Sequence, residues 1–370
     1  MPPPGRELSV GCAAGERRAA GLPRHGCRTS IGAIVRPDRT PPGGPLAETS
    51  PATHFTAFGY YLPPQHRTVE ELVDSKRTKS HAQRLRQLGH ERIHVAGDEP
   101  VESMAQRAVE DLVARSGFDL RRVDLVLYGG GLASSGVVAV ADRFDWLHAE
   151  NPHPLLRFPG PKMQIGLGLG VPVLGVSQLA CSTFQGAARL ARGLLAAEPA
   201  LRNVLLVAAD KFPVEANREI VYTLVSDGAC AAVVSRGEER HRLLSCNQVT
   251  RGAYWDNERS HDQLVAAYYP LARQSFDEAL QQAGTTSAQL ARVIPHNVNL
   301  RSWETMARVL GVPLEKVYTR NIARHGHAVS ADNVVNYVDA LDDGTLSPGD
   351  KVAWFVTGFG AHWSTLVMEV

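Results

Sequence analysis

A repeated order of secondary-structure patterns constrains the fold of this chain more than any single motif. The tetrapeptide LGVP begins at Leu169 and again at Leu310, each time between a helical pattern and a strand-like run. Upstream, VEDLVARSGFDLRRVDLVLYGGG parallels FDEALQQAGTTSAQLARVIPHNVN, and downstream NVLLVAADKFP parallels KVAWFVTGFGA. A tetrapeptide can recur by chance, but the same order of elements on both sides of it rarely does. We therefore expect an α/β fold of two similar halves, about residues 53–245 and 246–370.

The N-terminal segment has a different composition. Residues 1–52 are rich in Pro, Gly and Arg and show no sustained apolar period. We interpret them as a disordered extension, or as residues upstream of the true start. An Arg-rich targeting helix is the functional alternative, but the prolines would break it.

The overall composition is typical of a soluble globular protein. With 370 residues, 44% of them hydrophobic and 21% charged, the chain can bury a large core. A formal net charge of +1 gives no reason to expect a nucleic-acid or membrane-surface partner. No apolar run reaches the roughly 20 residues that cross a bilayer, and the N-terminus lacks the apolar core of a secretory signal. We expect a cytoplasmic protein.

The cysteines predict free thiols. They are five in number and include no CxxC pair, which argues against a disulfide framework or a zinc site: Cys12, Cys27, Cys181, Cys230 and Cys246. We therefore expect a reducing compartment and no bound metal.

Cys181 differs from the other cysteines in its position. In SQLACSTFQGAARLARGLL it stands where an apolar run meets a helical pattern. A helix N-terminus carries free N–H groups and partial positive charge, which lower a cysteine pKa and favour the nucleophilic thiolate. The alternative is that Cys181 is a small buried hydrophobic residue, as cysteines commonly are. Cys230 and Cys246 lie in strand-like sequence, and we interpret both as small buried hydrophobic residues.

Three histidines strengthen the nucleophile hypothesis. His296 directly follows the buried strand pattern ARVIP, and His325 and His327 flank Gly326 in RHGH, at the joint equivalent to that of Cys181. Any single histidine is more often an ordinary hydrogen-bonded residue than a catalyst. Several at equivalent joints of a duplicated fold favour a cysteine–histidine site.

From about His54 to Val370, the sequence resembles the β-ketoacyl synthase III branch of the thiolase-like condensing enzymes. ACSTF is similar to that family's cysteine motif, VIPHNVNLR to its histidine motif and RHGHAVSA to its His-Gly-Asn segment. DGACAAVV and GFGAHWS are similar to two further signature loops, and all five motifs occur in family order. The resemblance implies a five-layered αβαβα thiolase-like duplication, normally a homodimer.

The resemblance also implies roles for individual residues. Cys181 would accept an acyl group from a CoA or carrier-protein thioester. His296 and His327 would donate hydrogen bonds to the oxygen of a second, malonyl-type thioester as it loses CO2. The backbone N–H groups of Cys181 and Phe359 would form the oxyanion hole.

Two further residues match family positions outside the reacting centre. Arg301 matches a position that binds the acidic acyl carrier protein, and its alternative is a helix-surface arginine. Phe158, in RFPGPKMQ, matches a residue that reaches across the dimer to shape the partner's acyl pocket, and its alternative is a core aromatic residue.

The sequence departs from the family pattern at four places. His327 replaces the usual asparagine, as in the elongating ketosynthases, and can still donate to an enolate if neutral and in the right tautomer. SKRTKSHAQRLRQLG, part of an expected helix over residues 68–89, lacks the tryptophan that stacks on CoA adenine. GVVAVADRFDWLHAENPHPLL resembles an insertion, and the segment between Cys246 and Tyr268 is short. These departures favour a specialised-metabolism homologue that prefers carrier-protein thioesters.

The function expected from the sequence is decarboxylative Claisen condensation of an acyl group on Cys181 with a malonyl-type thioester. The nearest alternative is acyl transfer from Cys181 to a hydroxyl or amine of a small molecule. A non-catalytic partner subunit is the alternative from another class, and the cysteine and both imidazoles argue against it. Beyond the acyl-CoA or acyl-carrier phosphopantetheine substrates, we expect no cofactor.

Overall fold

The computed structural model describes residues 52–132, 153–237, 240–256 and 259–370. The expected N-terminal extension therefore lies almost wholly outside the described residues, as does most of the expected insertion before Phe158. Among the residues that are described, no helix has both the length and the apolar character needed to span a membrane.

The centre of the fold is formed by two groups of strands. The first has the order β5-β4-β6-β9-β1, with β1 (Thr53–Tyr61), β4 (Leu125–Gly129), β5 (Val173–Val176), β6 (Asn203–Asp210) and β9 (Gly228–Arg236). The second has the order β11-β12-β13-β10, with β10 (Arg242–Thr250), β11 (Arg292–Ile294), β12 (Lys351–Gly358) and β13 (His362–Glu369). The groups meet where His54 of β1 pairs with Arg242 of β10.

The two groups of strands repeat one order. In each, a parallel pair (β4 with β6, β11 with β12) is followed by two antiparallel pairs. β5 follows the first LGVP and lies parallel to β4, while Val317 follows the second LGVP and forms a single parallel bridge to Val293 of β11. The repeated order of sequence patterns around the two LGVP tetrapeptides thus corresponds to a repeated order of strands. The boundary expected between residues 245 and 246 lies inside β10 and stays a prediction.

The helices and the remaining short strands connect and cover these two groups. Their bounds are α1 (Val69–Asp74), α2 (Ala82–Gln87), α3 (Val101–Ser116), α4 (Pro159–Gly166), α5 (Thr183–Ala197), α6 (His261–Gln282), α7 (Leu300–Leu310), α8 (Arg320–His325), α9 (Asp332–Asp342), β2 (His66–Thr68), β3 (Arg92–His94), β7 (Glu219–Ile220) and β8 (Thr223–Leu224).

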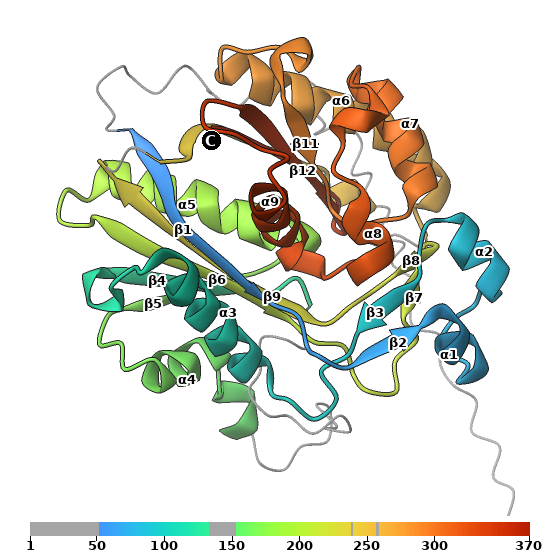
Figure 1. The fold of residues 1–370 in the computed structure, drawn as a ribbon, viewed down its shortest axis with the longest axis horizontal. Coiled ribbons are helices and arrows are strands. Elements are labelled where there is room, and N and C mark those ends of the chain that lie inside the picture. Colours follow the sequence, from blue (N-terminus) through green and yellow to red (C-terminus); the bar gives the residue numbers. More distant parts are fainter. Residues whose placement is uncertain (1–51, 133–152, 238–239, 257–258) are drawn as a thin grey trace, which may run out of the picture. The chain divides into compact units, whose positions relative to one another are not determined.

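Five layers result, alternating helices and strands (Figure 1). α5 and α9 lie between the two groups of strands, α3 and α4 cover the outer face of the first, and α6 and α7 cover that of the second. Phe184 of α5, Tyr337 of α9 and Trp354 of β12 belong to one buried cluster in the middle layer. This confirms the αβαβα thiolase-like fold expected from the resemblance.

The expected helix over residues 68–89 is wrong, because the segment forms two short helices. α1 ends at Asp74, and Lys76 then adopts a positive φ of 57°. The backbone N–H groups of Lys79 and Ser80 each donate to the Glu219 carboxylate at 2.7 Å, instead of to carbonyls of the preceding helical turn. A tertiary partner from the β7 strand thus overrides local helix propensity.

Candidate active site

Cys181 lies in a tight turn between β5 and α5. Gln178 and Ala180 both have positive φ, at 68° and 46°, and a single 3-10 turn from Ala180 to Ser182 leads into α5. The Thr183 hydroxyl donates to the Ala180 carbonyl at 2.7 Å and stabilises the turn. Non-glycine residues with positive φ carry local strain, which is found most often at functional sites. The chain therefore presents Cys181 on a constrained turn ahead of a central helix.

His327 is held by its backbone next to this turn. Its N–H donates to the Leu224 carbonyl at 2.9 Å, and its carbonyl accepts from the Ser226 N–H at 2.8 Å. Gly326 precedes it with a φ of 64°, and a Cβ there would lie 3.1 Å from the Leu224 carbonyl oxygen. Glycine therefore permits the close approach that places the imidazole.

Cys181, His327 and Asp332 form a hydrogen-bonded series. His327 Nε2 lies 3.2 Å from Cys181 Sγ, and His327 Nδ1 lies 2.5 Å from Asp332 Oδ2. The Asp332 carboxylate also accepts the backbone N–H of Ala328 at 2.7 Å and that of Asn297 at 2.5 Å. Asp332 was not among the site residues predicted from the sequence. The one signal for it was an acidic residue five positions after His327, at the start of α9.

Burial and nearby charges shift the pKa of His327 in opposite directions. Burial alone would lower its pKa, but the charges of Asp332 and Cys181, and hydrogen bonds with both, raise the pKa of His327 well above its ordinary value. Burial raises the pKa of Cys246 to about 11 and raises that of Cys230 well above its ordinary value.

His296 lies beside His327, as the sequence predicted. It follows β11 and is buried, and its ring centroid lies 5.8 Å from that of His327. Its Nε2 lies 3.1 Å from the Thr357 hydroxyl, which in turn lies 2.9 Å from the Tyr268 hydroxyl. Burial, together with the charge of His327, holds the pKa of His296 well below its ordinary value. His296 is therefore a neutral imidazole at pH 7. Neither Thr357 nor Tyr268 stands in a sequence pattern that indicates a functional site.

Apolar side chains also pack against Cys181. The thiol packs against a small cluster formed by Phe212, Val225 and Val329, with Leu132 and Ile220 at its edge. The site therefore combines a hydrophobic wall with a polar wall of imidazoles and hydroxyls.

The loop after β12 approaches the Cys181 turn closely. A Cβ on Gly358 would lie 3.3 Å from the Cys181 backbone nitrogen and 3.1 Å from the Ser182 hydroxyl oxygen, so the glycine permits the approach. Phe359 is the next residue and its side chain is partly exposed. The two backbone segments predicted to supply the oxyanion hole are thus neighbours.

Arg301 and Phe158 lie at the surface. Arg301 is in the first turn of α7, where its Nη1 donates to Glu304 at 2.9 Å and most of its side chain is exposed. Phe158 precedes α4, is 56% exposed and is therefore not a core aromatic residue of this chain. The roles predicted for both residues stay predictions.

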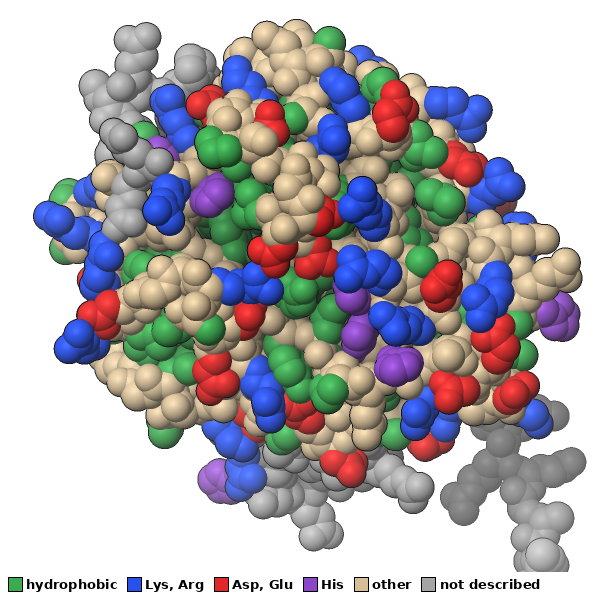
Figure 2. All heavy atoms as spheres, viewed as in Figure 1, with side chains coloured by type: hydrophobic (Ala, Val, Ile, Leu, Met, Phe, Trp, Pro, Cys, Tyr) green, Lys and Arg blue, Asp and Glu red, His purple; other side chains and the backbone are tan. Residues whose placement is uncertain are grey.

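His325 pairs with His94 and not with Cys181. Its Nδ1 lies 3.0 Å from Nε2 of His94, whose Nδ1 donates to the Pro63 carbonyl at 2.8 Å. Figure 2 shows histidines gathered on this face, near the place where β3 and α8 meet in Figure 1, among basic and acidic side chains that are interspersed. His325 and His94 therefore form an imidazole pair that is separate from His296 and His327.

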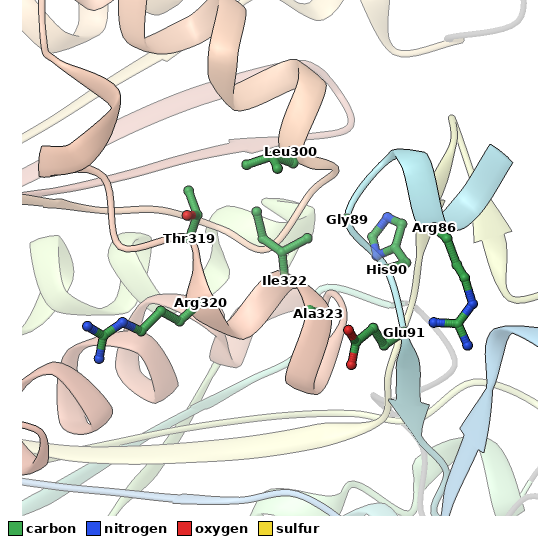
Figure 3. A pocket seen from close by; sticks show the side chains of 9 residues that line it. All are labelled: Arg86, Gly89, His90, Glu91, Leu300, Thr319, Arg320, Ile322 and Ala323. Atoms are coloured by element: carbon green, nitrogen blue, oxygen red, sulfur yellow. The ribbon is translucent and has the colours of Figure 1, made fainter. Parts of the chain in front are cut away.

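A surface pocket of about 310 Å³ lies near this region (Figure 3). α8 and the start of α7 form one side, with Ile322 and Leu300, and α2 with its connection to β3 forms the other, with Arg86 and His90. Neither Cys181 nor the two site histidines line it. It is therefore separate from the candidate active site.

Together, the duplicated five-layered fold and a cysteine ahead of a central helix define the thiolase-like class of protein. Comparisons with known proteins narrow this class. The family model for 3-oxoacyl-[acyl-carrier-protein] synthase III matches residues 177–252, and the model for its C-terminal part matches residues 280–370. The chain belongs to the β-ketoacyl-acyl carrier protein synthase III family.

Individual relatives agree with this assignment. The β-ketoacyl-[acyl-carrier-protein] synthase III of Aquifex aeolicus is 25% identical over 334 residues, covering 86% of this chain and 99% of the relative. That of Roseiflexus castenholzii is 27% identical, covering 73% and 92%. The solved structure of the Aquifex aeolicus synthase has a TM-score of 0.72 at 22% identity, covering 86% of this chain and all of the other. ChlB3, described as an acyltransferase, has a TM-score of 0.73 at 22% identity, covering 86% and 98%.

Proposed function

We propose that this chain is an acyltransferase that receives an acyl group on Cys181 from a thioester and passes it to a hydroxyl or amine of a small molecule. The observation that carries the proposal is the contact between His327 Nδ1 and Asp332 Oδ2 at 2.5 Å, combined with the 3.2 Å contact between His327 Nε2 and Cys181 Sγ. An ionised carboxylate only accepts hydrogen bonds, so a proton must stand on Nδ1.

The first half-reaction follows from this arrangement. His327 Nε2 takes the proton of Cys181, and the thiolate attacks the carbonyl carbon of the donor thioester. The backbone N–H groups of Cys181 and Phe359 would stabilise the oxyanion. When the intermediate collapses, the C–S bond to the donor breaks and His327 returns its proton to the departing thiol. The acyl-enzyme remains, with His327 neutral.

The second half-reaction decides between the two enzymatic functions. In neutral His327 the proton is on Nδ1, so Nε2 carries a lone pair. That lone pair can accept a proton from an attacking hydroxyl or amine, and the imidazolium then returns the proton to the sulfur of Cys181 as the thioester bond breaks. An enolate oxygen formed by decarboxylation would need a donor there. The Asp332 contact therefore favours acyl transfer.

Condensation is the second candidate, and one observation favours it. His296 and His327 are two adjacent buried imidazoles, the kind of pair that stabilises an enolate, and the raised pKa of His327 would help it regain a proton after acylation. The names of the synthase relatives fit this function. A non-catalytic subunit has no evident need for the Cys181–His327–Asp332 series.

The relatives' names also suggest the donor. They include the acyl carrier protein, and we propose an acyl-carrier thioester as the donor of this chain. The direct test is intact-protein mass spectrometry after incubation with acyl-carrier and acyl-CoA thioesters. We expect one acyl mass on the wild type and none on Cys181→Ala. Acylation that survives in Cys181→Ala would refute the proposed nucleophile.

A further inference from the structure

The Nε2 atom of His296 already has a partner in this protein. It lies 3.1 Å from the Thr357 hydroxyl oxygen, which lies 2.9 Å from the Tyr268 hydroxyl. The three residues come from segments far apart in sequence: the end of β11, the end of β12 and the first half of α6. The fold therefore brings two hydroxyl groups to one side of a buried imidazole that lies beside His327.

Besides the Thr357 hydroxyl, the ring of His296 has a hydrogen-bond contact with the backbone of Phe355 and edge-on contacts with aromatic rings. The ring meets Trp303, His327 and Phe355 edge-on, with centroids 5.7, 5.8 and 6.4 Å away. Such contacts tolerate ring rotation, and the terminal torsion of histidine has broad minima. The hydroxyl of Thr357 is thus a directional contact that sets where Nε2 points.

Tyr268 in turn fixes the Thr357 hydroxyl. A threonine hydroxyl rotates unless a second partner holds it. Burial raises the pKa of Tyr268 to about 12, so its phenol stays neutral at pH 7 and acts as a hydrogen-bonding group instead of a charge. Its ring is packed edge-on against Tyr269 and Trp363, with centroids 5.3 and 6.2 Å away.

We propose that Thr357 and Tyr268 are positioning residues that orient His296 for the transfer of the acyl group from Cys181 to the acceptor. This inference rests on the proposed function for its kinetic consequence, but the hydrogen-bonded series itself does not depend on which reaction follows. Neither residue touches Cys181 through a hydrogen bond, so loading of the thiol does not require them. The two residues would therefore act on the acceptor step, through the placement of the His296 ring beside His327.

The experiment uses three substitutions that change single groups. Thr357→Val keeps the shape and removes the hydroxyl, Thr357→Ser keeps the hydroxyl, and Tyr268→Phe removes only the phenolic oxygen. For Thr357→Val we expect the rate of acyl transfer at saturating acceptor to fall about 5- to 10-fold, the equivalent of one neutral hydrogen bond. Acceptor KM and the rate of Cys181 loading should stay within about twofold, since uniform binding is not lost. Thr357→Ser should restore the rate.

A second readout is independent of turnover. In protein labelled with ¹⁵N-histidine, the Nε2 resonance of His296 should move in Thr357→Val and Tyr268→Phe and stay in place in Thr357→Ser. Tyr269→Phe is the matched control, because Tyr269 neighbours Tyr268 without bonding to Thr357, and it should leave both readouts unchanged. Wild-type rate and wild-type resonance in Thr357→Val would overturn the inference. A wild-type acyl-enzyme that transfers to no hydroxyl or amine would instead overturn the proposed function, and the resonance would still test the series.

Discussion

Nδ1 of His327 lies 2.5 Å from Oδ2 of Asp332. The proton on Nδ1 is therefore donated to the carboxylate, and Nε2 can exchange protons with Cys181. This relationship distinguishes the site from one that holds an asparagine at the position of His327. An asparagine amide can only donate or accept hydrogen bonds, whereas a histidine held by a carboxylate can take up and release a proton.

Replacement of Asp332 should therefore remove the base without removing the imidazole. In Asp332→Asn the amide can donate to Nδ1, which favours the wrong tautomer of His327. We expect acyl transfer to fall by about 10²- to 10⁴-fold, the range seen when the carboxylate of a catalytic triad is lost. Asp339→Asn, a second buried aspartate on α9, serves as the control. Equal losses in the two variants would show that α9 was simply destabilised.

The carrier-protein prediction concerns Arg301. Its exposed position in the first turn of α7 suits contact with an acidic partner. Arg301→Glu should weaken kcat/KM for acyl-carrier donors at least about 10-fold, because it reverses a charge, and should change the CoA donors much less. Arg121→Glu, at an exposed arginine in the short 3-10 turn before β4, should affect neither donor. Equal losses on carrier and CoA donors would make Arg301 merely structural.

One edge of the sheet is a candidate interface for the homodimer that the resemblance implies. β5 is the outermost strand of its sheet, and exposed apolar residues lie on it and near it: Phe158, Ile165 and Leu174. An exposed apolar edge strand favours pairing with another chain. Leu174→Arg should convert a dimer to a monomer in light scattering over a concentration series. A wild type that is monomeric at all concentrations would contradict the prediction.

The buried histidines predict how stability depends on pH. Burial lowers the pKa of His90 from its ordinary 6.5 to about 4. Between these values the unfolded chain binds a proton that the folded chain does not, so the stabilisation is complete above pH 6.5 and is lost as the pH falls towards 4. The loss is on the order of 3 kcal/mol. Urea unfolding from pH 7.5 to 4.5 should show a shallower decline for His90→Gln than for the wild type. Identical slopes would contradict this assignment.

Much of the fold could be predicted from local sequence. The order helix, LGVP, strand, joint and helix follows from periodicity and turn residues within about 30 positions, and it predicted the duplication around Leu169 and Leu310. The break in the helix expected over residues 68–89 could not be predicted from local sequence. Glu219, more than a hundred residues later, binds the N–H groups that would have continued the helix.

Some of the site residues could likewise be predicted from local sequence, and others could not. Cys181, His296 and His327 each stand at a joint between elements, which sequence patterns can locate. Asp332 contacts His327 only because the chain between them turns tightly at Val329, whose φ is 51°. Thr357 and Tyr268 meet at His296 through packing of α6 on the second group of strands, and nothing in their own sequence indicates it.

In the proposed reaction, His327 serves as a base towards a hydroxyl or amine after Cys181 has been acylated. The most direct measurement starts from isolated acyl-Cys181 enzyme and offers it, in parallel, a panel of small alcohols and amines and a malonyl-carrier thioester labelled in its free carboxyl group. Loss of the acyl mass and release of labelled CO2 are followed together. We expect the acyl mass to be lost to an alcohol or amine, with an ester or amide formed and no CO2 released by the malonyl donor. Loss of the acyl mass only to the malonyl donor, with one CO2 per acyl group, would contradict the proposal and establish condensation.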